Sequence, residues 1–120
     1  MDIERYRNYC IAKKEVTESF PFPNLPSVLV FKVAGKMFTA TDVTSFATIS
    51  IRCNSDGIDE MRAKYPAVIK PAYFSDRHWS WVVMDNSVPD KKIFEWIDNS
   101  YQLAIDKLTK KAKLELKLPQ

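Results

Sequence analysis

Residues 66–81 read P-A-V-I-K-P-A-Y-F-S-D-R-H-W-S-W, and this stretch sets the arrangement of the second half of the chain. Two β-rich runs, residues 68–73 and 79–85, flank a polar interval, which predicts two antiparallel strands joined by a loop. The stretch holds the only histidine and two of the three tryptophans, interleaved with Lys70 and Arg77. Rings and cations in this arrangement either stack on a flat anionic partner or hold a corner of the sheet together.

A β-hairpin is the clearest unit upstream of this stretch. Residues 27–33 and 36–41 are β-rich and flank a turn at Gly35, where a positive φ is available at low cost. We expect Lys32 and Lys36 almost opposite each other at the hairpin tip.

A further strand and a short helix lie between the hairpin and residues 66–81. Residues 47–53 alternate apolar and polar side chains, which predicts a half-buried strand with Thr48, Ser50 and Arg52 on its wet face. Residues 58–64 follow as a short helix.

The two ends of the chain read as helices. Apolar residues at helical spacing predict a helix over residues 2–14, followed by an extended, proline-rich connector at 17–26. A second helix is predicted over residues 87–111, with Ser87 and Asp90 spaced as in a capping box.

The order of elements is therefore α-β(3)-α-β(2)-α over a single domain, residues 1–120. Helices segregated from a β-meander predict an α+β, two-layer domain in which an antiparallel sheet has its helices packed on one face. Residues 112–120 alternate apolar and polar side chains and are expected to be a tail or an added edge strand.

Composition and charge limit the class of protein. The net charge is +3, and the basic surplus sits in residues 61–120, which carry eleven Lys and Arg against seven Asp and Glu. This balance permits an anionic partner without requiring one. The two cysteines form no metal-type or CxxC pair, and no apolar run reaches the length of a membrane helix. We expect a reduced, cytoplasmic protein without a membrane partner, monomeric or weakly dimeric.

Five ordered motifs carry a family resemblance: F-P-F at 20–22, V-F-K-V-A-G-K-M-F at 30–38, K-Y-P-A-V at 64–68, P-A-Y-F-S-D-R-H-W at 71–79 and D-N-S-Y-Q-L-A at 98–104. With them the chain resembles the MmcQ/YjbR-like family of small bacterial proteins. The resemblance implies a fold described as secretion-chaperone-like or frataxin-like, with the α-β(3)-α-β(2)-α order.

The resemblance also implies a function, because DNA binding through two protruding β elements, a double wing, has been proposed for the family. The wings would be the Lys32–Lys36 hairpin tip and the loop from Tyr73 to Trp79. This chain departs from the family pattern with Phe74 in place of His and S-D-R at 75–77 in place of Met-Asn-Lys-Lys. One cation is lost and one acid gained.

Nucleic-acid binding would use cations on phosphates and rings as stacking platforms. The candidate residues are Lys32, Lys36, Arg52, Lys70, Tyr73, Arg77, His78 and Trp79. The structural alternative is that Trp79 and Trp81 share one pleat face and point into the core, while the hairpin lysines only protect a sheet edge.

Enzymatic and metal-binding functions find little support in the sequence. His78 is the only conventional base, and Ser75, Asp76 and His78 on one loop do not make a catalytic triad. Cys10 and Cys53 lie in no nucleophile motif, and no zinc, P-loop or dinucleotide motif is present. We expect no enzyme, no cofactor and no metal. The alternative to DNA is a protein-interaction or chaperone-like module that binds a protein segment on the open sheet face or edge.

Overall fold

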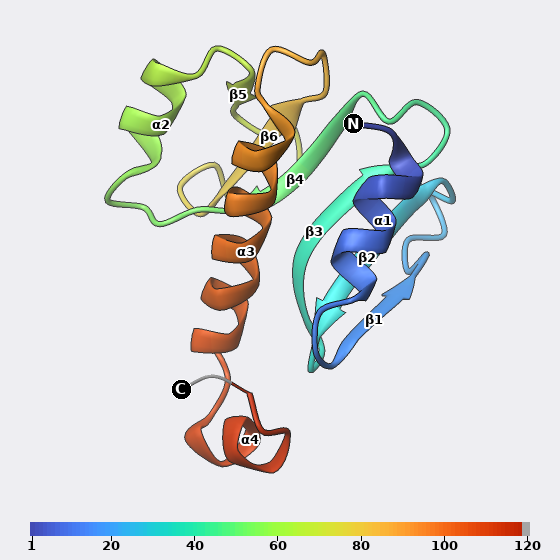
Figure 1. Ribbon diagram of the computed structural model, residues 1–120, viewed down its shortest axis with the longest axis vertical. Helices are drawn as coiled ribbons and strands as arrows, with labels where there is room; N and C mark the ends of the chain where they lie inside the picture. Colours follow the sequence, from blue (N-terminus) through green and yellow to red (C-terminus); the bar gives the residue numbers. More distant parts are fainter. Residues whose placement is uncertain (119–120) are drawn as a thin grey trace.

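Helical and extended segments alternate along the chain, and the structure, a computed structural model, describes residues 1–118 (Figure 1). The elements, in chain order, are α1 (Ile3–Ile11), β1 (Val16–Ser19), β2 (Val28–Val33), β3 (Lys36–Asp42), β4 (Thr48–Arg52), α2 (Ile58–Lys64), β5 (Val68–Ile69), β6 (Trp79–Val83), α3 (Asp90–Asp106) and α4 (Lys110–Glu115).

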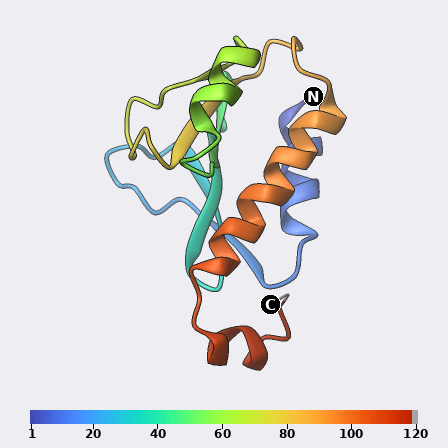
Figure 2. The same cartoon turned by 90° about the vertical axis from the view of Figure 1, so that its left-hand side faces the viewer.

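The strands form one antiparallel sheet of six, in the order β1-β2-β3-β4-β6-β5. The long helix α3 and the first helix α1 cover one face, and the opposite face carries only loops (Figure 2). The predicted α+β, two-layer arrangement is confirmed. No helix among residues 1–118 is long and apolar enough to span a membrane.

The core lies between the sheet and these two helices. Tyr6 of α1 and Phe38 of β3 are fully buried, and each makes an edge-on ring contact, Tyr6 with Phe31 at 5.6 Å and Phe38 with Tyr101 at 5.3 Å between centroids. Full burial of one such ring contributes roughly 1.5–3 kcal/mol to folding. These contacts fix the helices on one face and leave the other face free.

The hairpin forms where the sequence predicts it, with Ala34 (φ 49°) and Gly35 (φ 81°) both in the left-handed region that a tight turn requires. Its two-residue turn pairs Val33 with Lys36 and Lys32 with Met37, so the two lysines are offset by one position, and a β-bulge at Phe38 shifts the register only beyond this pair. The two lysines therefore flank the hairpin tip without facing each other.

The sequence prediction missed strand β1. Residues 16–19 pair with β2 in the register Val16↔Val33 to Ser19↔Val30, where the sequence predicts only the start of an extended connector. The nearby prolines follow the strand at positions 21, 23 and 26, so they leave these four residues free to join the ladder.

The C-terminal helix is shorter than predicted. It ends at Asp106, and the hydroxyl of Thr109 accepts a hydrogen bond from the amide of Ala112, which caps the separate helix α4. The edge strand that was one alternative for 112–120 is wrong for residues 112–115, which belong to α4, and residues 119–120 lie outside the described range. The capping box is also wrong, because Pro89 occupies the N-cap of α3 and no side chain caps it.

Candidate functional site

The open face of the sheet presents alternate residues of each strand. Ala40, Ser50 and Trp81 form one row across β3, β4 and β6. Trp79 lies on the same face as Trp81, as the structural alternative required. That face is not the core face. Val82, the next residue along β6, has its side chain on the opposite face and belongs to the buried cluster. Neither tryptophan belongs to the cluster under the helices, so the expectation that both point into that core is wrong in direction, although Trp79 is buried and its ring lies against that of Phe74 on the open face.

A groove of about 390 Å³ runs over this open face. It is lined by Phe22, Leu25, Val28, Ala40, Thr41, Asp42, Ser45, Thr48, Ser50, Tyr73, Phe74 and Trp81. The small side chains of Ala40 and Ser50 lie at its floor on the central strands. Its walls come from two loops, residues 20–27 and 70–78, which stand out from the sheet on the side away from α1 and α3 (Figure 2).

Aromatic contacts pack the second wall against β6. The ring of Tyr73 lies 5.8 Å from that of Trp81, and the ring of Phe74 lies 5.1 Å from that of Trp79. Tyr73 is still 58% exposed, so most of its ring faces the groove or solvent.

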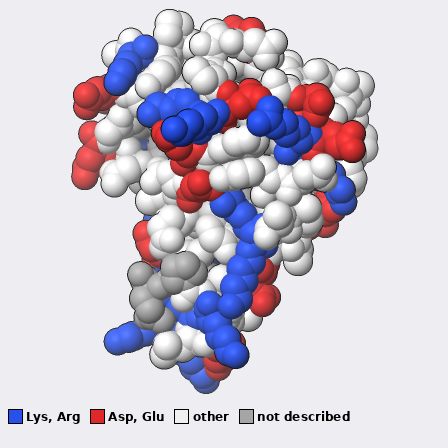
Figure 3. All heavy atoms as spheres, in the orientation of Figure 1, with Lys and Arg blue, Asp and Glu red and all other residues white. Residues whose placement is uncertain are grey.

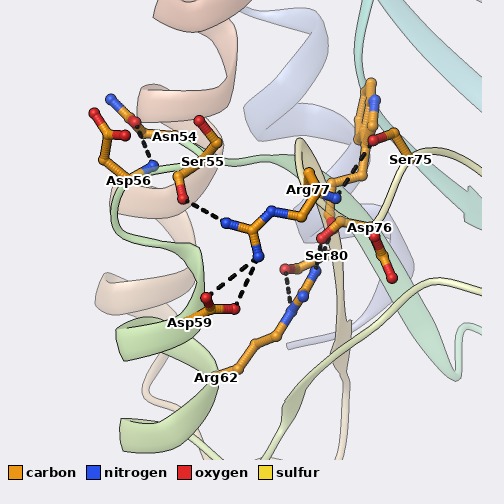
Figure 4. A network of polar contacts seen from close by, with 10 residues as sticks. Asn54, Ser55, Asp56, Asp59, Arg62, Ser75, Asp76, Arg77 and Ser80 are labelled. Atoms are coloured by element: carbon orange, nitrogen blue, oxygen red, sulfur yellow. Dashed lines mark hydrogen bonds and ion pairs between the residues drawn. The ribbon is translucent and has the colours of Figure 1, made fainter.

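Arginines from α2 and from the loop itself hold this wall in place (Figure 4). Arg62 donates hydrogen bonds to the carbonyl oxygens of Asp76 and Trp79, both at 2.7 Å, and to the hydroxyl of Ser80 at 3.2 Å. Arg77 pairs with Asp59 of α2 at 3.1 Å. The loop is therefore fastened to α2 at several points.

Three of the predicted nucleic-acid contacts, Arg52, Arg77 and Trp79, make contacts within the protein. Arg52 donates to the carbonyl of Met37 at 2.7 Å and lies over the Trp79 ring at 4.8 Å, and burial lowers the pKa of its guanidinium. Arg77 is held by Asp59 and by the carbonyl of Ser55. Trp79 is only 7% exposed. These side chains shape the loop and the sheet surface rather than standing free for a partner.

The remaining candidate cations do not gather on one surface. Lys32 and Lys36 flank the β2–β3 tip, whereas Lys70 follows β5 at the opposite edge of the sheet. Within residues 1–118, none of these three lysines forms an ion pair.

The hairpin tip instead shares one end of the molecule with α4 (Figures 1 and 2). Residues 106–118 carry five lysines against Asp106 and Glu115, a surplus of three that equals the net charge of the whole chain. Lys14 joins this end, because its ammonium donates to the carbonyl of Lys117 at 3.1 Å. We call Lys14, Lys32, Lys36, Lys107, Lys110, Lys111, Lys113 and Lys117 the basic end. Figure 3 shows lysines gathered around α4 with few acids among them.

His78 tethers its loop through the backbone rather than through its ring. Its carbonyl accepts the amide hydrogen of Cys53 at 2.7 Å, and its amide donates to the carbonyl of Ser75 at 3.3 Å. The side chain is exposed. Among residues 1–118 there is no group of three or more His, Cys, Asp or Glu side chains arranged to hold a metal ion.

Both cysteines are buried, and burial raises the pKa of each thiol above its ordinary value. The thiolate is the reactive form, so we predict that Cys10 and Cys53 react with a thiol-specific reagent at neutral pH only as fast as the protein unfolds. Absorbance measurements with Ellman's reagent, without and with denaturant, check this. Rapid labelling of one thiol in the native protein would identify an accessible site.

Sequence reasoning missed three features of this region. The groove combines loops 20–27 and 70–78, which are distant in sequence, so no local pattern marks it. Arg62 reads as an ordinary charge on a short helix. The predicted helix end at residue 111 divides the lysines of residues 107–117 between that helix and the 112–120 segment, so the sequence does not mark them as one site.

Comparison with known proteins relates the whole chain to bacterial proteins of similar size. The sequence model of the YjbR family, described simply as YjbR, matches residues 11–103. The chain is 28% identical over 120 residues to the "Uncharacterized protein YjbR" of Escherichia coli strain K12 and to that of strain O157:H7, covering 98% of this chain and 100% of each relative.

Solved structures agree with the fold. Protein DR2400 of Deinococcus radiodurans superposes with a TM-score of 0.91 at 29% identity, covering 98% of this chain and 89% of that one. A crystal structure of a protein from Pseudomonas syringae superposes with a TM-score of 0.73 at 18% identity, covering 87% and 99% of the two chains. The latter likeness concerns the fold alone.

Proposed function

The chain belongs to the YjbR family, and from this premise we propose that it is a non-enzymatic protein that binds the sugar-phosphate backbone of DNA at its basic end. One observation carries the proposal: the lysine surplus of residues 106–118 lies beside the hairpin tip at one end of the fold. The proposal retains the hairpin as one wing but replaces the Tyr73–Trp79 loop with α4 as its neighbour.

Electrostatics supports this surface over the others. Lysines on phosphates release condensed counterions, and each neutralised phosphate of duplex DNA contributes a slope of about −0.9 to log affinity against log salt. At the basic end, the acids of residues 106–118 are Asp106 and Glu115. The N···O distance of the ion pair Lys111–Glu115 is long, at 3.8 Å. Arg77, the one Lys or Arg of the Tyr73–Trp79 loop, by contrast pairs with Asp59 and with the backbone carbonyl of Ser55.

Charge reversal at the basic end tests the proposal. We predict that Lys110→Glu with Lys113→Glu, and separately Lys32→Glu with Lys36→Glu, weaken binding to a fluorescent duplex by about tenfold or more in low salt and flatten the salt slope by about two phosphates. Fluorescence anisotropy over a salt series measures both quantities.

The matched control reverses two lysines elsewhere, Lys70→Glu with Lys91→Glu. It changes the net charge equally, and at 0.15 M salt the screening length of about 8 Å keeps its effect at the basic end small. If wild type shows no salt-dependent binding, or if the control weakens binding as much as the α4 variant, the proposal is wrong. A loss in the control alone would restore Lys70 and its loop as the nucleic-acid surface.

A further inference from the structure

The groove on the open face is a second surface with a different chemistry, and it does not depend on the DNA proposal. Its floor follows the central strands at Ala40 and Ser50, and the side walls at 20–27 and 70–78 rise on either side. A groove of this form runs along the strands, so it suits an extended chain lying over the sheet face.

The lining of the groove is mainly apolar and aromatic. Phe22, Tyr73, Phe74 and Trp81 supply rings from both sides. Among the lining residues of the described chain, Asp42 is the only charged one, and Lys and Arg are absent. Phosphate groups would find no cation here, which separates this surface from the basic end.

Asp42 fixes a negative charge at one end of the groove. Its carboxylate accepts the amide hydrogens of Thr44 at 2.8 Å and of Ser45 at 3.4 Å, so the turn after β3 holds the side chain in place. Within residues 1–118 it pairs with no cation. The carboxylate is exposed and can take a cation from outside.

We propose that the groove docks an extended segment of a partner protein, with an apolar or aromatic side chain among the rings and a lysine or arginine two residues away at Asp42. The spacing follows from β geometry. Asp42 lies two positions after Ala40, about 7 Å along β3. Side chains on one face of an extended segment repeat at the same interval.

Rigidity of the walls favours this use. Arg62 and Arg77 fasten the 70–78 loop to α2, and the Tyr73 ring rests on Trp81, so the wall is formed before a partner arrives. A preformed wall reduces the ordering cost of binding.

Phage display of random seven-residue peptides against the immobilised protein tests the proposal. We expect enrichment of an aromatic or large aliphatic residue with lysine or arginine two positions away. A fluorescent synthetic copy of the enriched peptide should bind Tyr73→Ala about tenfold more weakly, since an aromatic contact is worth up to about 1.5 kcal/mol. Asp42→Asn keeps the turn, because its amide oxygen still accepts both hydrogen bonds, and should weaken binding about two- to fivefold.

Two controls make the result specific. Phe20→Ser removes an exposed ring that does not line the groove and should leave affinity unchanged. A peptide with glutamine replacing its cation should bind wild type and Asp42→Asn equally. Absence of enrichment, or affinity insensitive to Tyr73→Ala, overturns the proposal. So does sedimentation showing that Tyr73→Ala converts a dimer to a monomer, which would make a second copy of this chain the occupant.

Discussion

Replacing Arg62 by methionine will lower the free energy of unfolding by about 2–3 kcal/mol. The guanidinium donates to two backbone carbonyls and to the buried hydroxyl of Ser80, and a hydrogen bond from a charged donor contributes about 1.5–3 kcal/mol. Arg62 is half-buried, so solvent screening keeps the total well below the sum of three such bonds. Methionine retains much of the packing while it removes every donor. Urea denaturation followed by tryptophan fluorescence measures the change.

Arg77→Met is the matched control, because Arg77 lies on the loop that Arg62 of α2 holds. Its ion pair with Asp59 joins side chains that are 52% and 75% exposed, and exposed pairs contribute about 1 kcal/mol or less. Arg62→Met should also speed hydrogen exchange at the amide of Trp79, which donates to the carbonyl of Ser75. Equal destabilisation by the two variants would show that α2 holds the loop through the outer ion pair, contrary to the geometry.

Short-range signals predicted much of the fold. The helix expected at 58–64 has those bounds, the turn at Gly35 lies where glycine indicates it, and strand β4 (Thr48–Arg52) falls within the predicted 47–53. Strand β1 was not predicted, because it is held by pairing with β2 and no local sequence pattern encodes that pairing. The end of α3 was not predicted, because the residues around Thr109, the N-cap of α4, continue the apolar spacing of a helix.

The candidate site was harder to predict because it depends on which cations the fold already uses. Lys32 and Arg52 look equivalent in sequence, yet Arg52 is engaged by Met37 and Trp79 while Lys32 stands at the hairpin tip. Tyr73 is a sequence candidate and is exposed, but its role as a groove wall needs Phe22 and Leu25, some fifty residues earlier. The role of each residue depends on which distant residues the sheet brings close to it, and a local sequence pattern does not contain that information.

Ser100→Ala will lower the free energy of unfolding by about 2–4 kcal/mol, although it removes a single oxygen atom. The Ser100 hydroxyl, fully buried on α3, accepts the amide hydrogen of Arg52 at 2.7 Å and donates to the carbonyl of Phe38. The pairing of β3 with β4 ends at Thr39 and Ile51, one residue before Phe38 and Arg52, so the hydroxyl supplies partners just beyond the end of this ladder. Each buried backbone group left without a partner costs about 1–3 kcal/mol. Chemical denaturation with a two-state fit measures the loss.

The adjacent residue provides the control for Ser100. Asn99→Ala changes an exposed position of the same helix and should shift stability by no more than about 0.5 kcal/mol. Ser100→Thr keeps a hydroxyl and should recover part of the loss, because the hydrogen bonds return while the added methyl group crowds the core. Should Ser100→Ala cost less than about 1 kcal/mol, water or a shifted strand must satisfy the two backbone groups, and α3 would then cover the bulge without holding it.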